Sequence, residues 1–206
     1  MKIGHERVEI VIATRNKQKL EEVRRIALDW AIPILSLDNF PDCPQVEEDG
    51  ETFEANAVKK AASVARCSGK HALADDSGLE VDALGGAPGV LSSRYAGRDA
   101  DDLKSIEKLL NAMRSVGAER RGGRFVCCLA LASPAGVLKT FWGEVRGRIG
   151  TEPRGTSGFG YDPVFYPEGQ HRTFAEMSAV EKDIISHRGK ALRELGRYLR
   201  ANAGVS

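Results

Sequence analysis

The sequence predicts an α/β fold, and three observations support this prediction. Short, mostly apolar runs at 8–13, 34–37 and 71–74 have the length and composition of buried strands. The segments 20–30 and 52–68, which separate these runs, carry apolar residues at three- and four-residue spacing, as amphipathic helices do. Farther along, two longer apolar runs flank a Ser-Pro-Ala-Gly turn and predict an antiparallel hairpin.

Local signals set the expected ends of these elements. Pro33 ends the first helix, because its ring cannot continue the helical hydrogen bonding, and Gly69 is a natural stop for the second. The hairpin strands are expected at 125–132 and 137–145, with 146–149 extending the second of them.

Length and composition narrow the class of protein. The 206 residues predict a single domain over 1–206 with 42% hydrophobic residues, enough for a real core. Charged residues balance to a formal net charge of +1, which argues against a nucleic-acid partner. No apolar run approaches the roughly 20 residues that span a bilayer, so we expect no membrane segment.

The termini and the cysteines indicate the compartment. Residues 1–9 are polar and lack the apolar core of a signal peptide. The four cysteines show no metal-ligand spacing and nothing demands a disulfide, so we expect a reducing cytoplasm. Cys127 and Cys128 lie in an apolar run, where at least one thiol is expected to be a small core residue.

A polar turn follows the first strand and has the pattern T-x-N-x-x-K. Thr14 to Asn16 make a strand-to-helix turn with Asn16 as a helix N-cap, and Lys19 lies in the first helical turn. Free backbone N–H groups at such a turn favour anions, so the pattern predicts a triphosphate cradle. An ordinary capped helix with an exposed lysine is the structural alternative.

Two acidic clusters interrupt otherwise unremarkable segments. The strand at 71–74 is expected to end in Asp75 and Asp76, and adjacent carboxylates are costly there unless a cation or a donor faces them. The loop 38–50 carries the second cluster, at 47–49. A solvated turn with a helix-capping Asp, and a solvated acidic surface, are the respective alternatives. Together the clusters supply hard oxygen ligands for Mg²⁺.

Three helical segments remain. Asn56 lies on the helix at 52–68 and is either a core hydrogen bonder or a ligand contact, while the helix at 101–116 looks purely structural. The last helix, 187–200, begins with His187 and Arg188, where cations oppose the helix dipole unless an anion or a base is bound.

A glycine-rich loop at 150–160 carries Phe159 between two glycines. Its ring could stack on a base face or tuck into the core beneath the loop. One ligand fits the phosphate cradle, the two acidic clusters and the aromatic loop together, namely a nucleoside triphosphate with Mg²⁺. The chain lacks a Ser-His-Asp order and a cysteine nucleophile pattern, which favours attack by water.

Taken together, these stretches resemble the non-canonical purine nucleoside triphosphate pyrophosphatases, also called inosine/xanthosine triphosphate pyrophosphatases. The matching stretches read ATRNKQKLEEV, EEDGETFEANAVKKA, ADDSGLEVDALGGAPGVLSSRYAG, GTSGFGYDPVF and EKDIISHRGKAL. The resemblance implies an α/β fold with a long bent mixed sheet, two lobes with a substrate cleft between them, and a homodimer. It also implies hydrolysis of ITP, dITP, XTP and dXTP to monophosphate and pyrophosphate, which cleanses the nucleotide pool.

The resemblance also implies roles for individual residues. Glu48 and Asp76 match the metal-binding acids, and Asp76 also matches the proton acceptor. The phosphate-binding stretch comprises Thr14, Arg15, Asn16, Lys17, Gln18 and Lys19. The remaining substrate contacts are Ser77, Phe159, Gly160, Tyr161, Asp162, Lys182, His187 and Arg188. Arg15 stands where many members have Gly, and residues 1–9 match no family element.

The mechanism expected from these roles is attack of water on the α-phosphorus. Mg²⁺ and Lys19 offset phosphate charge, and Asp76 orients or deprotonates the water. Two other hypotheses remain: a nucleotide-sensing module that does not hydrolyse, and a septum-formation-type pyrophosphatase with a different base preference. The acid clusters argue against the first, and the Ser-His-Arg segment after Glu-Lys-Asp argues against the second.

Overall fold

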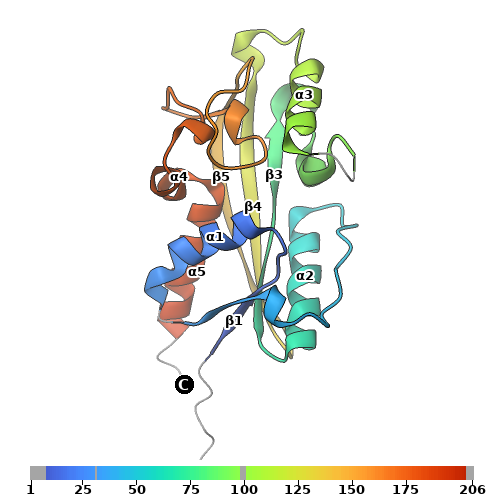
Figure 1. The fold of residues 1–206 in the computed structure, drawn as a ribbon, viewed down its shortest axis with the longest axis vertical. Coiled ribbons are helices and arrows are strands. Elements are labelled where there is room, and N and C mark those ends of the chain that lie inside the picture. The colour runs from blue at the N-terminus through green and yellow to red at the C-terminus, as the bar shows by residue number, and fades with distance from the viewer. Residues whose placement is uncertain (1–7, 31, 98–100, 203–206) are drawn as a thin grey trace, which may run out of the picture. The chain divides into compact units, whose positions relative to one another are not determined.

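The computed structural model describes residues 8–30, 32–97 and 101–202 (Figure 1). The expectation that residues 1–9 match no family element concerns mainly residues 1–7, which lie outside the described residues. Within these residues, six strands form one open sheet in the order β2-β1-β3-β4-β5-β6. The sheet is mixed, because β1 pairs in parallel with β2 and β3, whereas β5 and β6 are antiparallel. The predicted α/β class is confirmed. The strands are β1 (Ile10–Ile12), β2 (Ile34–Ser36), β3 (His71–Val81), β4 (Gly122–Ser133), β5 (Gly136–Ile149) and β6 (Phe165–Pro167).

Several helix ends follow the capping signals in the sequence, although α1 ends at Ile26, before the Pro33 that was expected to end it. Asn16 caps the first helix by accepting a hydrogen bond from the Lys19 N–H, and Thr52 caps the second in the same way. Gly69 ends the second helix in the left-handed conformation, with φ of 67°. The helices are α1 (Lys17–Ile26), α2 (Phe53–Ser68), α3 (Asp102–Ala112), α4 (Ala179–Ile185) and α5 (His187–Asn202).

Several element ends differ from the sequence prediction. The most important difference is in β3, which does not end at the acidic pair but continues to Val81, so Asp75 and Asp76 lie inside a strand. Residues 8 and 9 are outside β1, and α3 ends at Ala112 rather than at residue 116. The hairpin strands are longer than predicted, and β5 includes the expected extension at 146–149.

The chain forms two compact units. The first comprises residues 1–76, 128–141 and 192–206, as far as they are described, and the second comprises 77–127 and 142–191. The boundaries fall inside β3, β4, β5 and α5, so each of these elements contributes residues to both units.

Small residues bring the helices of the first unit close to their neighbours. Ala57, Ala61 and Ala65 form the buried stripe of α2. Trp30 is buried and packs on α5 at Gly196, where a Cβ atom would lie 2.7 Å from the indole Nε1. In the view of Figure 1, α1 and α5 overlap on one side of β1, and α2 lies on the other side.

Aromatic rings fill the core of the second unit. Phe125 and Phe165 meet edge to face with centroids 4.7 Å apart, and Phe174 stacks on Phe165 at 5.4 Å. Trp142 belongs to this unit but not to its core, since 47% of its surface is exposed.

The cysteines differ in part from expectation. Cys43 and Cys67 form a disulfide with Cα atoms 5.6 Å apart, which the sequence did not require. The pair is brought together because the loop after β2 returns along α2, so their separation of 24 residues in sequence gave no signal. Cys127 and Cys128 are both buried in the core, which confirms the expectation that at least one of them is a core residue. None of the helices within the described residues is long and apolar enough to cross a membrane.

Candidate functional site

The predicted phosphate turn is an ordered strand-to-helix connection in the first unit. The Thr14 hydroxyl accepts a hydrogen bond from the Asn16 N–H at 3.1 Å, and the Asn16 side chain accepts one from the Lys19 N–H at 3.0 Å. Arg15, Asn16, Lys17 and Gln18 are exposed. Arg15 donates to the Cys43 carbonyl at 3.2 Å and so ties this turn to the disulfide-bonded loop.

The acidic pair in β3 faces cations on both sides. Successive side chains of a strand point to opposite faces, and Asp75 and Asp76 follow this rule. The Asp75 carboxylate forms an ion pair with Lys19 of α1, whereas Asp76 contacts side chains of α2. This arrangement explains how two adjacent buried acids are tolerated inside a strand, because each has a charged or amide donor.

Lys60 of α2 joins the two acidic clusters. Its buried ammonium donates to Glu48 Oε1 at 2.7 Å, to the Asp75 carbonyl at 2.6 Å and to Asp76 Oδ1 at 3.1 Å. Glu48 is therefore part of the site, while Glu47 is exposed and Asp49 pairs at the surface with Lys59. Glu47 and Asp49 thus belong to a solvated acidic surface, which was the alternative for this cluster, whereas Glu48 does not.

Burial and charge shift the protonation of this cluster. Burial raises the pKa of the Asp76 carboxyl, Lys60 opposes the shift, and Glu48 adds to it. Burial alone would lower the pKa of Lys60, but Asp76 and Glu48 outweigh it and raise that pKa. Asp76 is thus a carboxylate with increased basicity, which suits a proton acceptor.

The donor set fits a hard divalent cation. The Lys60 ammonium already shows that oxygens of Glu48 and Asp76 converge on one positive centre. The residues that the structure describes contain no group of three or more His, Cys, Asp or Glu side chains placed to hold a metal. Two carboxylates nevertheless suffice for Mg²⁺ when substrate phosphates complete its coordination.

A second group of predicted residues assembles in the other unit, around Phe159. The ring is half-buried, with Lys182 Nζ 4.8 Å from its centroid and the Arg188 guanidinium 5.6 Å away. Asp162 holds the loop, because its Oδ2 accepts from the Phe159 N–H at 2.9 Å and from Lys182 Nζ at 2.5 Å. Phe159 is not a member of the core beneath the loop.

The remaining predicted contacts occupy buried or half-buried positions. Arg188 is almost fully buried and donates to the Ser77 hydroxyl at 2.8 Å, which brings two predicted residues together. His187 begins α5 and stacks on Phe125 with centroids 4.7 Å apart. Tyr161 lies in the core and donates to the Ser92 carbonyl at 3.0 Å, so its ring has a structural role there.

Two residues of these clusters were missed in the sequence. Lys60 could have been found, because it lies on the face of α2 that carries Phe53, Ala57 and Val64, where a lysine is out of place. Asp102 accepts a hydrogen bond from the Gly160 N–H at 2.6 Å, so α3 contributes to the Phe159 loop and is not purely structural. A partner 58 residues away in sequence leaves no local signal for this contact.

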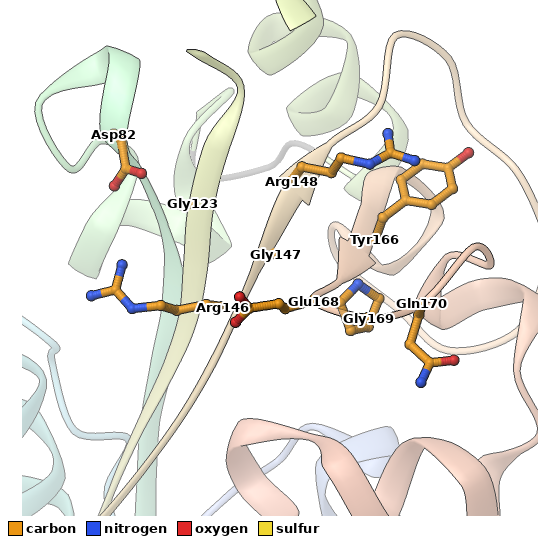
Figure 2. A pocket seen from close by; sticks show the side chains of 10 residues that line it. Asp82, Gly123, Arg146, Gly147, Arg148, Tyr166, Glu168, Gly169 and Gln170 are labelled. Atoms are coloured by element: carbon orange, nitrogen blue, oxygen red, sulfur yellow. The ribbon is translucent and has the colours of Figure 1, made fainter. Parts of the chain in front are cut away.

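A separate concavity of about 410 Å³ lies in the second unit and contains none of the predicted site residues. Figure 2 shows its two arginines diverging: Arg148 lies beside Tyr166, whereas Arg146 points toward Asp82. The Arg148 guanidinium covers the Tyr166 ring at 4.1 Å. The two positive charges therefore do not converge on one anion.

Comparisons with known proteins identify relatives of this chain. A model of the Ham1 family matches residues 10–198. The dITP/XTP pyrophosphatase of Geobacter sulfurreducens is 51% identical over 92% of this chain and 96% of its own length, and that of Bacillus subtilis is 45% identical over 94% and 98%. The solved HAM1 protein of Coxiella burnetii superposes with a TM-score of 0.85 at 43% identity, covering 94% of this chain and 99% of that one.

Proposed function

Because this chain belongs to the Ham1 family, we propose that it hydrolyses non-canonical purine nucleoside triphosphates, dITP and XTP among them, to monophosphate and pyrophosphate. One observation of the structure supports this proposal most directly. Glu48 and Asp76 converge on the Lys60 ammonium, in the same unit as the capped N-terminus of α1. A converging acid pair suits a divalent cation, and a helix N-terminus favours the phosphate groups of a triphosphate.

Each residue has a part in the proposed reaction. Lys19 and the N–H groups at the start of α1 bind phosphate oxygens, and the charge of Lys19 offsets the charge that develops on the leaving pyrophosphate. Asp76 accepts the proton of the attacking water. Glu48 and Asp76 hold Mg²⁺, which when bound offsets phosphate charge and lowers the pKa of a neighbouring water.

The base is recognised by the second cluster in this proposal. Phe159 stacks on the purine, and His187 and Arg188 lie near its polar edge. Ser77, Gly160, Tyr161, Asp162 and Lys182 complete the contacts, with Tyr161 contributing through its backbone because its ring is in the core.

The assembly and location follow the same reasoning. We propose that one domain over residues 1–206 carries the activity and that two chains form a homodimer in the cytoplasm, where nucleoside triphosphates are made. Light scattering should then give about twice the 22.4 kDa mass of one chain. A mass of one chain at micromolar concentration would reject the dimer and leave the activity untouched.

Pyrophosphate release from a panel of nucleotides tests the function. With Mg²⁺ present, we expect turnover of ITP, dITP and XTP to exceed that of ATP, GTP, dTTP and dUTP. Excess chelator should abolish it, and Ca²⁺ should replace Mg²⁺ poorly, because Ca²⁺ prefers more ligands at longer distances. Binding without pyrophosphate release would support a sensing module instead, and preference for dTTP or dUTP would support a septum-formation-type enzyme.

A further inference from the structure

Asn56 of α2 has every polar atom of its side chain engaged. The residue is fully buried. Its Oδ1 accepts from the Gly50 N–H at 2.8 Å, and its Nδ2 donates to the Gly50 carbonyl at 3.3 Å and to Asp76 Oδ2 at 3.2 Å. The orientation of the amide follows from chemistry, because a backbone N–H can only donate and must face the oxygen. The NH₂ group is therefore directed at Asp76.

Gly50 is the place where the acidic loop meets this amide. It follows Glu48 by two residues in a segment without helix or strand. A Cβ atom at this position would lie 2.7 Å from Asn56 Oδ1 and 3.0 Å from the Ala55 Cβ. A glycine is thus required for the loop to approach α2 closely enough to form both hydrogen bonds.

Asn56 and Lys60 are one helical turn apart, and together they contact Asp76 and the loop that carries Glu48. Lys60 binds Asp76 Oδ1 and Glu48, and Asn56 binds Asp76 Oδ2 and the loop two residues after Glu48. The two oxygens of Asp76 consequently have different partners, one a charged ammonium and the other a neutral amide. The amide fixes the rotation of the carboxylate without adding charge.

We propose that Asn56 is a positioning residue, whose amide sets both the rotation of the Asp76 carboxylate and the approach of the Glu48 loop. This inference rests on the proposed function, in which those acids hold a divalent cation and accept a proton. Asn is suited to the task because one short side chain supplies an acceptor and two donors. Asp would place an oxygen toward Asp76 Oδ2, and Ala would leave the buried carboxylate without its neutral donor.

Asn56→Asp and Gly50→Ala test the proposal from both sides of the contact. Loss of an outer partner of a metal ligand typically costs about 10- to 100-fold in affinity or activity. We expect kcat for dITP to fall by about that factor in both variants, with the KM for dITP changed by less than about threefold. Mn²⁺ binding to the nucleotide-free protein, measured by calorimetry, should weaken by roughly 10-fold. Asn111→Asp, the same change at an exposed helical position, is the matched control and should behave as wild type.

A double-mutant cycle with Gly50→Ala and Asn56→Ala separates positioning from general loss of stability. If both residues act through one contact, the double variant should lose about as much kcat as the worse single variant. Losses that multiply would overturn the proposal, as would single variants that keep both kcat and Mn²⁺ affinity within about twofold of wild type. If Asn56→Asp does not fold, the kcat and the Mn²⁺ affinity of Gly50→Ala decide whether the proposal holds, because that substitution lies in the loop. A wild type that releases no pyrophosphate from dITP would reject the proposed function, while the Mn²⁺ measurement would still test the positioning role.

Discussion

Asp76 is the residue on which both the metal site and the proton transfer depend in the proposed mechanism. Its carboxylate is buried between Lys60 and Asn56. Asp76→Asn removes the proton acceptor and one negative charge but keeps the shape of the side chain. We expect kcat for dITP to fall by about two to four orders of magnitude. Steady-state kinetics check this, with Asp82→Asn, at an exposed position directly after β3, as a control that should retain full activity. Near-normal turnover in Asp76→Asn would remove it from the catalytic role.

Phe159 and Arg188 should contribute differently to base selection. A phenyl ring stacks on any base, at roughly 1–3 kcal/mol, so Phe159→Ala should lower kcat/KM for ITP and ATP alike. Arg188 only donates hydrogen bonds and so favours the 6-oxo group of hypoxanthine over the 6-amino group of adenine. Arg188→Ala should therefore narrow the ratio of kcat/KM for ITP to that for ATP.

If Arg188→Ala leaves the ratio of kcat/KM for ITP to that for ATP unchanged, other hydrogen-bond donors must select the base. The nearest backbone candidates are already engaged, since the Phe159 N–H faces Asp162 and the Gly160 N–H faces Asp102. Asp102→Asn would then be the informative next variant, because it weakens the acceptor for Gly160 without touching the ring.

Among the elements, the helix ends that carry a capping signal could be predicted from sequence, whereas the end of β3 could not. Asn16, Thr52 and Gly69 act on backbone groups within four residues of themselves, so the local sequence contains the whole signal. The continuation of β3 through Asp75 and Asp76 depends instead on Lys19 and Lys60, which come from two different helices. Lys60 did leave a local signal, as a lysine on the apolar face of α2, and the phosphate turn and the Phe159 loop are contiguous motifs that can be read directly from the sequence.

At Cys43 the loop between β2 and α2 is held by the disulfide and by a hydrogen bond from Arg15, in addition to its contacts with Asn56 and Lys60. A cross-link that closes about 24 residues restricts the unfolded chain and is worth about 3 kcal/mol. Reduction should therefore lower Tm by roughly 6–12 °C in a chain of this size. Calorimetry with and without reductant measures this, and the Cys43→Ser, Cys67→Ser double variant should not respond to reductant. A wild-type Tm that ignores reductant would contradict the assignment.

The start of α4 should depend on pH through Glu181. Its carboxylate accepts from Arg172 and from Ser178, and these contacts hold the pKa of Glu181 at about 2, below the usual 4.5. A folded-state pKa below the unfolded value contributes stability above pH 4.5, which is lost as pH falls toward 2. Glu181→Gln should therefore lower the urea midpoint near neutral pH and lower it progressively less below pH 4.5. If Glu181→Gln lowered the urea midpoint equally at neutral pH and well below pH 4.5, the low pKa of Glu181 would be rejected.

At the scale of the whole molecule, two units share four continuous elements. β3, β4, β5 and α5 each begin in one unit and end in the other. The chain therefore passes from one unit to the other inside a strand or a helix at every one of these boundaries, unlike a chain whose domains are joined by a loop. We expect the two units to unfold in one cooperative transition.

The two tryptophans give each unit an optical reporter of its own. Trp30 is buried in the first unit and Trp142 is 47% exposed in the second, and the chain has no other indole. Water relaxes around an exposed excited indole, so Trp142 should emit at longer wavelength than Trp30 and be quenched more readily by iodide. Trp142→Phe and Trp30→Phe then isolate one emission each. In both variants the fluorescence change in denaturant should coincide with the loss of circular dichroism, and a signal from Trp142 that changes first would show that the second unit opens separately.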